Sequence, residues 1–303
     1  MSRRRGRAIN GILPFDKPAG LSSNAALQEV KRLYEARRAG HAGTLDPFAT
    51  GLLPICFGEA TKFSGQLLDA DKTYVATARL GIATDTGDPE GEVSDRAEVP
   101  NLGFDELAAA TRRFVGEIEQ IPPMYSALKH RGRRLYELAR EGKAVERKAR
   151  RVRIDAFDLL DLDSPVCRFR IRCSKGTYVR TLVEDFAQAI GTVGHTVALR
   201  RTGVGPFHGM DMLKLEDLAE LDLTERDVRL LPVDAALAEL PIERLGADEL
   251  GGLKFGNPIE LVREPNAPPG PVRIYLEEKF LGLGELDEDR QLRPKRMVQQ
   301  SKG

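Results

Sequence analysis

The chain has 303 residues, which is enough for one large core or for two domains, and its 41% apolar and 30% charged residues are typical of a globular protein in water. No stretch approaches 18 consecutive apolar residues, so the sequence predicts neither a membrane span nor a signal-peptide core, and we expect a cytoplasmic location. The three cysteines lack metal-ligand spacing and the four histidines form no His-x-x-x-His pair, so we expect reduced thiols and no bound metal. The formal net charge is zero.

The N-terminal part of the chain predicts a strand, a helix and then a constrained loop. An apolar run, Ile9–Phe15, ends in the turn signal Asp16–Gly20. Ser22 or Ser23 can then cap a helix that continues to Arg38.

The loop that follows, Gly40–Leu53, is the most informative segment of the sequence. Asp46 stands there among glycines, a proline and small or apolar neighbours. Pro47 pushes Asp46 out of the α region, and the glycines allow another backbone to approach closely. A carboxylate held in this way costs stability unless it is paired or used in chemistry. We therefore interpret Asp46 as a candidate functional carboxylate rather than as part of an ordinary Asp-Pro turn.

The middle of the chain alternates strands, loops and helices. Tyr74–Leu80 has the alternation of a strand, and Asp85–Gly91 is an acidic, glycine-rich loop. A helix is predicted over Phe104–Val115, beginning near Asn101 and ending at Gly116. Tyr74 opens its strand, where an aromatic ring can also stack on a nucleic-acid base.

A second strand and helix carry a row of arginines. Val166–Cys173 alternates apolar residues with Arg168, Arg170 and Arg172, and a glycine turn then leads into a helix over Thr177–Ile190. Arg180 falls in the first turn of that helix, where a cation opposes the helix dipole. A buried carboxylate would favour it there, and Asp46 is the candidate, although a surface arginine is the alternative. Such an ion pair would hold Asp46 ionised near neutral pH.

The segment Pro232–Pro241 is the expected end of the first domain. Beyond Leu240 the sequence predicts a small β-barrel made of short strands separated by glycine and proline. These strands are Pro258–Val262, Pro271–Leu276, Phe280–Leu283 and Arg296–Val298.

Charge is unevenly distributed along the chain. Lys129–Arg153 contains eleven Lys or Arg and three Glu, and Arg168–Arg180 contains five Lys or Arg and no acid. Acids gather instead in Asp85–Glu98 and Glu216–Glu249. A neutral protein can bind a polyanion through such a basic stripe, although solvated faces are the alternative.

Sequence motifs of hydrolases, of P-loop nucleotide-binding proteins and of dinucleotide-binding enzymes are absent. The sequence has no Gly-x-Ser-x-Gly elbow, no P-loop and no Gly-x-Gly-x-x-Gly after a strand. What it offers is one constrained aspartate, an arginine, aromatic side chains and a basic surface. That set suits chemistry on a nucleic-acid base without a cofactor.

Four segments resemble motifs of the TruB family of tRNA pseudouridine synthases, and the tail resembles a PUA RNA-binding domain. The four segments are Asp16–Ser23, Gly40–Leu53, Gln120–Lys129 with Tyr136–Arg140, and Ser174–Arg180 with Ala198–Arg201. The matching parts of the tail are Lys254–Pro258, Leu281–Glu285 and Pro294–Arg296.

The resemblance implies an α+β fold with two domains. A pseudouridine synthase domain would occupy residues 1–240, with a central mixed, mostly antiparallel sheet flanked by helices and a basic RNA-gripping insertion at about 124–153. A small PUA-like β-barrel that binds RNA would occupy residues 241–303. The implied reaction converts uridine 55 in the T loop of tRNA to pseudouridine by flipping the base and moving its link with the ribose from N1 to C5. Because atoms are conserved, no cofactor is expected.

The resemblance also assigns roles to residues of the site. Asp46 is the catalytic carboxylate, Arg180 pairs with it, and Tyr74 stacks on the target base. Tyr178 lies near the base, and the remaining residues, His41, Leu199 and Lys17, contact the uridine or shape its pocket. The family mechanism is argued as attack on C1′ or as removal of the C2′ proton, and the sequence leaves both open. The role of the row Arg168, Arg170 and Arg172 also stays open.

Three functions remain compatible with these features. The first is a stand-alone, monomeric enzyme that acts on the T arm of tRNA with no obligatory protein partner. The second is a guide-dependent synthase of the dyskerin kind, and the third is a non-catalytic RNA-binding protein in which Asp46 is structural. The basic insertion Lys129–Arg153 and the absence of a lysine-rich tail favour the first.

Overall fold

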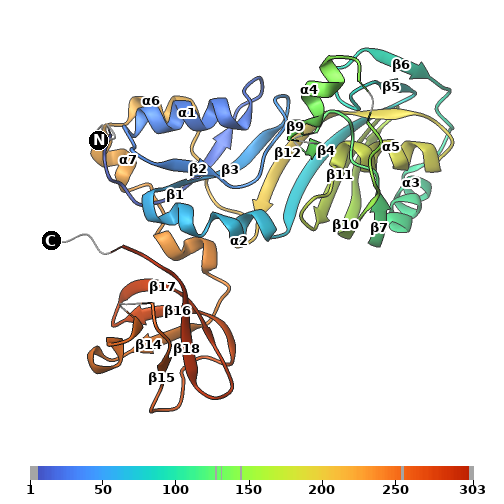
Figure 1. Ribbon diagram of the computed structural model, residues 1–303. Helices are drawn as coiled ribbons and strands as arrows, with labels where there is room; N and C mark the ends of the chain where they lie inside the picture. Colours follow the sequence, from blue (N-terminus) through green and yellow to red (C-terminus); the bar gives the residue numbers. More distant parts are fainter. Residues whose placement is uncertain (1–5, 127, 131, 144, 254–255, 300–303) are drawn as a thin grey trace.

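Two separate sheets organise the chain (Figure 1). The structure is a computed structural model and describes residues 6–126, 128–130, 132–143, 145–253 and 256–299. Within these residues a nine-stranded sheet has the order β1-β3-β12-β4-β11-β10-β7, with β2 beside β3 and β13 beside β12. The pairing of β12 with β3 is parallel and the other pairings are antiparallel, so the predicted mixed, mostly antiparallel sheet is confirmed.

The strands of the large sheet come from residues spread over two thirds of the chain. They are β1 (Gly11–Lys17), β2 (Ala39–His41), β3 (Thr50–Phe57), β4 (Lys72–Leu80), β7 (Gly116–Gln120), β10 (Arg150–Asp163), β11 (Val166–Cys173), β12 (Gly194–Val204) and β13 (Phe207–His208). Two small antiparallel ribbons pair β5 (Ile82–Thr84) with β6 (Val93–Arg96) and β8 (Lys129–His130) with β9 (Arg133–Arg134).

Short helices and single turns connect these strands. The α-helices are α1 (Ser23–Leu33), α2 (Ser64–Asp69), α3 (Phe104–Thr111), α4 (Leu135–Arg140), α5 (Val179–Ala189), α6 (Leu215–Glu220) and α7 (Leu223–Asp227). The 3₁₀ turns are η1 (Gly58–Lys62), η2 (Arg112–Phe114), η3 (Val233–Leu237) and η4 (Ala247–Leu250).

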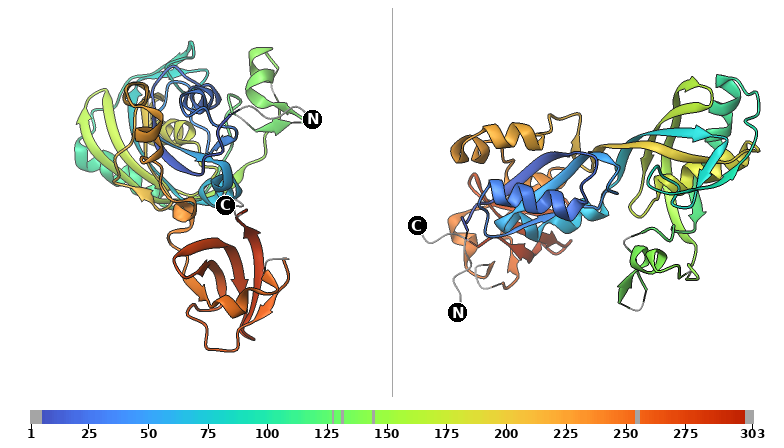
Figure 2. Two further views of the ribbon diagram at one scale, coloured as in Figure 1. Left: turned by 90° about the vertical axis from the view of Figure 1, so that its left-hand side faces the viewer. Right: turned by 90° about the horizontal axis from the view of Figure 1, so that it is seen from above.

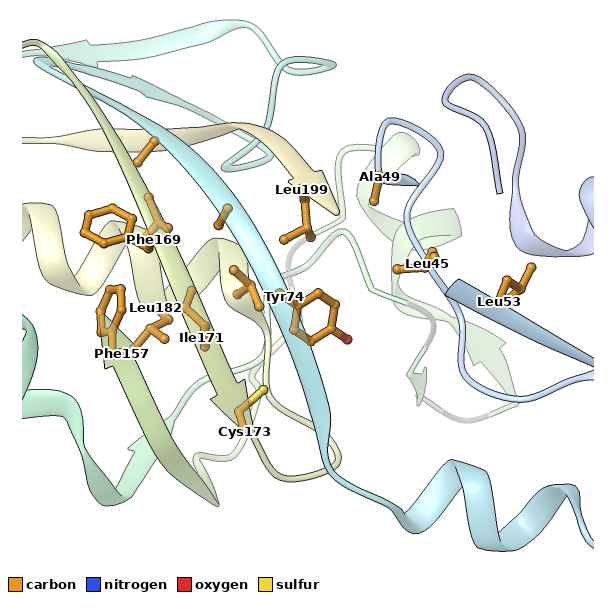
Figure 3. Packing of buried hydrophobic residues seen from close by; sticks show 14 of the residues in the cluster. Leu45, Ala49, Leu53, Tyr74, Phe157, Phe169, Ile171, Cys173, Leu182 and Leu199 are labelled. Carbon is orange, nitrogen blue, oxygen red and sulfur yellow. The ribbon is translucent and has the colours of Figure 1, made fainter. Parts of the chain in front are cut away.

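The two ends of the large sheet are covered differently. Every residue of β1 is buried, because both faces of this strand are covered. One face packs on α1 and α6, and the other face packs on a second apolar cluster that contains Phe63, the residue between η1 and α2. Strands β10 and β11 are buried on one face only, where Phe157 and Phe169 meet Phe186 of α5 at ring-centroid distances of 5.7 and 5.1 Å. Figure 3 shows this packing extending across β4 toward the loop that carries Leu45. The opposite face of β11 is exposed to solvent.

Two predicted helices are shorter than the sequence suggested. The helix capped by Ser22 ends at Leu33 instead of Arg38, because Glu35 adopts a positive φ of 49° and the chain turns toward β2. The helix that begins at Phe104 ends at Thr111 and tightens into η2. Helix α5 begins two residues later than predicted, which still places Arg180 in its first turn. The predicted strand Val166–Cys173 is confirmed at both ends.

The tail forms a five-stranded sheet with its own apolar core. Its strands are β14 (Ile242–Leu245), β15 (Ile259–Glu260), β16 (Gly270–Leu276), β17 (Lys279–Leu286) and β18 (Gln291–Met297), in the order β14-β16-β17-β18-β15. The sequence pattern missed β14, a four-residue strand that pairs in parallel with β16. Of the predicted tail motif, residues 254 and 255 lie outside the described residues.

The tail sheet packs directly against the first part of the chain. Phe280 lies edge-on to Phe63, with ring centroids 5.5 Å apart. Lys62 Nζ donates to the Met297 carbonyl at 2.9 Å, and Arg273 Nη1 lies 3.1 Å from Asp234 Oδ2. An apolar contact and two polar ones therefore fix the tail against η1 and η3.

An insertion interrupts the edge of the large sheet. Strands β7 and β10 pair antiparallel, and residues 121–149 between them leave the sheet and carry β8, β9 and α4. The right-hand view of Figure 2 shows this green segment projecting from the body of the protein. Residues 127, 131 and 144 of the insertion lie outside the described residues.

The cysteines, the helix lengths and the grouping of possible metal ligands also bear on the predictions. Cys56, Cys167 and Cys173 are free and buried, as predicted. Within the described part of the chain no helix is long and apolar enough to cross a membrane. The His, Cys, Asp and Glu side chains of the described ranges form no group of three that could hold a metal ion.

Candidate active site

A cavity of about 210 Å³ opens where the loop between β2 and β3 meets β4, β12 and the start of α5. Its lining includes five of the seven predicted site residues, Asp46, Tyr74, Tyr178, Arg180 and Leu199. The fold therefore brings together side chains that lie as far apart in sequence as Asp46 and Leu199. His41 and Lys17 are not part of the lining.

The loop that carries Asp46 is anchored from the side of β1 and α1. Ser23 Oγ accepts from the Leu45 amide at 2.8 Å and donates to the Leu45 carbonyl at 3.0 Å. Lys17 Nζ donates to the Pro47 carbonyl at 3.1 Å and also to two carbonyls of its own turn, those of Pro18 and Leu21. Burial lowers the pKa of the Lys17 ammonium to about 8. Lys17 therefore acts on Asp46 in two ways: it holds the neighbouring backbone, and its charge lowers the pKa of the Asp46 carboxyl.

Arg201 anchors the same loop from the side of β12. Its side chain is 1% exposed, and it donates from Nε to the Leu52 carbonyl at 2.7 Å and from Nη2 to the Gly43 carbonyl at 3.0 Å. Gly51 has a φ of 97°, and a Cβ there would lie 2.2 Å from the Arg201 carbonyl oxygen. Only glycine permits this close approach of β3 to β12. The sequence motif contained Arg201, but nothing in the pattern indicated this contact.

Arg180 is the centre of the polar contacts at the cavity. Its Nε lies 3.0 Å from Asp46 Oδ2, so the predicted ion pair is present, and an exposed fraction of 3% excludes the alternative of a surface arginine. Its Nη1 donates to Asp88 Oδ2 at 2.8 Å and to the Thr86 carbonyl at 2.6 Å, while Nη2 donates to the Tyr125 carbonyl at 2.7 Å. A planar guanidinium can hold several groups at once in fixed directions. Asp46 is therefore oriented by a side chain that is itself held on two further sides.

Asp88 is a site residue that the sequence analysis missed. It lies in the acidic segment Asp85–Glu98, which looked separate from the basic runs, and its carboxylate is nearly fully buried against Arg180. Thr86 Oγ1 and the Glu90 amide also donate to Asp88 Oδ1, at 2.6 and 3.0 Å. The sequence signal that could have identified it was the dense Thr-Asp-Thr-Gly-Asp turn, in which hydroxyls and amides can fix a carboxylate.

Burial changes the acidity of Asp46. It raises the pKa of the Asp46 carboxyl, Arg180 lowers it, and the charge of Asp88 raises it further, with a net shift upward. The 34% of the Asp46 side-chain surface that is exposed faces the narrow cavity, so desolvation still outweighs the ion pair. The ion pair with Arg180 therefore stabilises the ionised form of Asp46 less than the sequence analysis predicted.

Comparison with known proteins identifies the family. A family model described as TruB family pseudouridylate synthase (N terminal domain) matches residues 31–179, and the model for the tRNA pseudouridylate synthase B C-terminal domain matches residues 180–238. A third model, pseudouridine synthase II TruB, C-terminal, matches residues 241–298. The chain belongs to the TruB family.

Curated relatives match over nearly the whole chain. The protein named tRNA pseudouridine synthase B from Chromohalobacter salexigens is 51% identical over 98% of this chain and 96% of its own. Proteins of the same name from Dechloromonas aromatica and Burkholderia mallei are 48% and 52% identical, covering 98% and 96% of this chain and 98% of each relative.

Solved structures share the fold at lower identity. A Cbf5-Nop10-Gar1 complex contains a chain that is 24% identical, with a TM-score of 0.70 over 95% of this chain and 84% of that chain. An H/ACA RNP bound to a substrate RNA contains one that is 23% identical, with a TM-score of 0.72 over 96% and 86%. The predicted pseudouridine synthase fold is therefore confirmed for the TruB chain.

The aromatic residues of the TruB site come from two different elements. The ring of Tyr74 points from β4 toward the loop that carries Leu45 and Ala49 (Figure 3). Burial raises the pKa of the Tyr74 phenol, and Arg201 opposes that shift through its charge and a side-chain hydrogen bond. Tyr178 immediately precedes α5, where burial likewise raises the pKa of its phenol.

Gln120 fixes the position of Tyr178. Its side-chain amide donates to the Tyr178 carbonyl at 3.0 Å and accepts from the Tyr178 amide at 2.8 Å. Gln120 is the last residue of β7 and is 2% exposed, so the insertion begins at a point held rigidly to the cavity. A buried glutamine before Pro122 and Pro123 gave no sequence signal for this contact.

His41 lies at the end of β2, beside the loop but outside the cavity wall. Burial lowers the pKa of its imidazole, and the nearby charge of Arg201 lowers it further. Its Nδ1 is buried and has no hydrogen-bond partner among the described residues. The neutral ring therefore predominates near neutral pH, and its place beside the loop leaves its predicted role with the uridine as a proposal.

The arginine row of β11 lies on the exposed face of the sheet, away from the cavity. Arg170 Nη2 lies 3.0 Å from Asp158 Oδ2 on the neighbouring strand, and Arg172 Nη2 lies 3.9 Å from Asp71 Oδ2. The first is a cross-strand ion pair of the kind that stabilises a sheet surface, and the second joins β11 to the turn before β4. They give Arg170 and Arg172 a structural explanation, whereas Arg168 has no ion pair among the described residues.

Proposed function

We propose that this chain isomerises uridine 55 in the T loop of tRNA to pseudouridine, without a guide RNA, a protein partner or a cofactor. The observation that carries the proposal is the Asp46–Arg180 ion pair in the wall of the cavity, with Arg180 Nε 3.0 Å from Asp46 Oδ2. Family membership supplies the reaction class, and relatives about 50% identical carry the name tRNA pseudouridine synthase B.

The cavity can accept a base only after the nucleotide has turned out of the T loop. Unstacking costs a few kcal/mol, and stacking on an aromatic ring returns about 1–3 kcal/mol. Tyr74 supplies that ring, and Leu199 and Tyr178 line the rest of the cavity. The uracil ring would thus leave the neighbouring bases of the T loop and contact side chains of β4, of β12 and of the residue before α5.

Asp46 performs the chemical step in this proposal. The bond between C1′ and N1 breaks, the base turns, a bond forms between C1′ and C5, and the proton leaving C5 is balanced by one gained at N1. The carboxylate either attacks C1′ or removes the C2′ proton in the first stage. Because burial raises its pKa, Asp46 is a better nucleophile and base than an exposed aspartate, while Arg180 Nε keeps it oriented.

Two further regions would hold the RNA. The basic insertion at about 124–153 would grip the T arm, since Arg150 and Arg151 are exposed and have no ion-pair partner among the described residues. Arg150 lies opposite Gln120, which hydrogen-bonds the backbone of Tyr178, and the charge of Arg150 lowers the pKa of the Tyr178 phenol. We assign residues 1–240 to the catalytic domain and 241–303 to a PUA-like RNA-binding domain of a cytoplasmic monomer.

Release of tritium from tRNA labelled at uridine C5 tests the proposal directly. Purified wild-type protein, with no guide RNA and no other protein, should release tritium from unmodified tRNA, and Asp46→Asn should release none above background. Asp211→Asn, at an exposed position, is the matched control and should retain full activity. A wild-type protein without activity would refute the proposal, and an active Asp46→Asn variant would refute the role of Asp46.

A second experiment tests whether uridine 55 is the target nucleotide. A transcript in which uridine 55 is replaced by cytidine, with labelled uridines elsewhere, should release no tritium. Activity that appears only after a guide RNA is added would instead favour the guide-dependent alternative.

A further inference from the structure

Among the described residues, six buried side-chain nitrogen or oxygen atoms have no hydrogen-bond partner. They belong to His41, Ser126, Arg147, Thr181, Thr192 and Thr196. Of these residues only Ser126 lines the cavity. Ser126 therefore brings an unsatisfied hydroxyl to the wall of the cavity, where its oxygen is covered until the side chain turns toward a ligand.

The backbone on both sides of Ser126 is held by hydrogen bonds. The preceding carbonyl, that of Tyr125, accepts from Arg180 Nη2 at 2.7 Å, and the Ser126 carbonyl accepts from the Tyr136 amide at 3.1 Å. Ser126 is 4% exposed. Because this backbone is fixed and buried, the hydroxyl has little freedom to find a partner elsewhere.

The other small hydroxyls with defined contacts at the cavity are already used within the protein. Thr177 Oγ1 donates to the Ser174 carbonyl at 3.0 Å, and Ser174 Oγ accepts from the Arg153 amide at 2.9 Å. Ser126 lies close enough to the Tyr178 phenol to lower the pKa of that group, but it does not reach full hydrogen-bond geometry with it. Ser126 is thus left with an open hydrogen-bonding position beside Tyr178.

A buried hydroxyl without a partner costs free energy, which a ligand recovers when it supplies one. Arg180 lies between Asp46 and the segment that carries Ser126. Its Nε contacts Asp46, and its Nη2 donates to the carbonyl of Tyr125, the residue before Ser126. If the ribose lies at Asp46, the uracil ring extends away from Asp46. Its O4 and N3–H groups then point away from the bond that breaks, and its O2 group lies beside that bond. A hydroxyl can donate to either oxygen or accept from N3–H.

We infer that the Ser126 hydroxyl hydrogen-bonds the polar edge of the flipped uracil ring, which makes Ser126 a specificity-determining residue. This inference rests on the proposed function, because it requires a uridine in the cavity. It also connects the insertion to the site, since Ser126 belongs to the base of the insertion and is positioned by the same arginine that orients Asp46.

Binding of two T-arm hairpins isolates the contact with the base. One hairpin carries uridine at the target position, and the other carries an abasic ribose with the same phosphates. In an Asp46→Asn background, which prevents turnover, Ser126→Ala should weaken binding of the uridine hairpin about tenfold, the change that about 1.4 kcal/mol produces. Its affinity for the abasic hairpin should not change.

Thr192→Val is the matched control. It removes another buried, unpartnered hydroxyl, at a position that does not line the cavity. Both substitutions should leave the thermal unfolding temperature unchanged or higher, because each removes an unsatisfied polar group. Only Ser126→Ala should lower kcat/KM for tRNA in the catalytically intact protein, by about tenfold.

The outcomes separate this inference from the proposed function. Equal weakening of both hairpins would show that Ser126 acts on the fold of the insertion, and no weakening of either would show that its hydroxyl is unused; both results overturn the inference. A wild-type protein that releases no tritium would refute the proposed function instead. An active wild-type protein with an equally active Ser126→Ala variant would refute the inference alone.

Discussion

The basic runs Lys129–Arg153 and Arg168–Arg180 have similar charge in the sequence, but the fold gives them different surroundings. In the second run Arg170 pairs with Asp158, Arg172 lies near Asp71, and Arg180 is buried between two carboxylates. In the first run several members pair with Glu141 or Asp155, but Arg150 and Arg151 are exposed and have no ion-pair partner within the described ranges. The same composition thus produces a surface row with two ion pairs, a buried arginine that orients Asp46, and an exposed surface with unpaired cations.

The difference lies in the neighbouring strands. Strand β11 is flanked by β10 and β4, so acidic side chains of β10 and of the turn before β4 lie opposite its arginines. The first run occupies an insertion and the edge part of β10, where β7 is the last strand of the sheet. Glu119 of β7 lies opposite Arg151, but among the described residues no ion pair joins them, so the proposed contact with RNA falls where the edge of the sheet leaves cations unpaired.

Removing Arg180 should have the largest effect, because it is the one member of the second run that contacts Asp46. Arg180→Met leaves Asp46 and Asp88 buried without their cation, and tritium release should fall on the order of 10³-fold. Arg180→Lys should restore little, since an ammonium cannot hold carboxylates and carbonyls in three fixed directions. Circular dichroism should show a folded protein; activity within tenfold of wild type would remove Arg180 from the proposed machinery.

Asp88→Asn should have the next largest effect and should change the pH profile. It keeps the shape of the side chain but weakens the hold on Arg180, so kcat should fall about 10- to 100-fold. The negative charge of Asp88 raises the pKa of Asp46, and in the proposed mechanism Asp46 reacts in its ionised form. Removing that charge lowers the Asp46 pKa, so the acid limb of the kcat profile should move to lower pH.

Asp95→Asn, at an exposed position of β6, is the control for this change and should leave both kcat and the profile unaltered. An acid limb that moves to higher pH in Asp88→Asn would contradict the electrostatic link between the two carboxylates.

The exposed arginines of the first run should govern affinity. Reversing both charges in Arg150→Glu/Arg151→Glu should weaken tRNA binding about tenfold or more at low salt, with a smaller loss at high salt. The slope of log affinity against log salt should decrease by about two, one for each lost phosphate contact. Filter binding over a salt series measures both values. A salt slope equal to that of the wild type would mean that these arginines do not touch the RNA.

The structural row should show the smallest effect. Arg168→Gln/Arg172→Gln removes two exposed cations from the face opposite the cavity, and tRNA affinity should change less than about twofold. Exposed ion pairs contribute about 0–1 kcal/mol each, so the thermal unfolding temperature should fall by only a few degrees. A loss of affinity comparable with that of the first run would place RNA on this face and erase the distinction between the two runs.

The parts of the site that could be predicted are those with a local cause. Glycines and Pro47 constrain the Asp46 loop within a few residues, and a cation in the first turn of α5 needs a partner. Local physical chemistry therefore made Asp46 a candidate partner of Arg180, with a surface arginine as the alternative. The strand with the clearest alternation, β11, was also predicted at its correct bounds. The end of α1 was not, because Glu35 takes a left-handed conformation that no sequence pattern required.

The sequence by itself determined most of the elements and the chemical character of the Asp46 loop, because backbone restriction by proline and glycine and the periodicity of apolar residues act over short distances. The tertiary structure alone decided the rest of the site. Arg201 lines the cavity, and Asp88 and Gln120 hold the cavity residues Arg180 and Tyr178, only because the fold brings distant segments together. The open hydroxyl of Ser126 exists because the neighbouring groups have other partners. A hydrogen bond depends on which atoms meet in space, and that is fixed only when the sheet has formed.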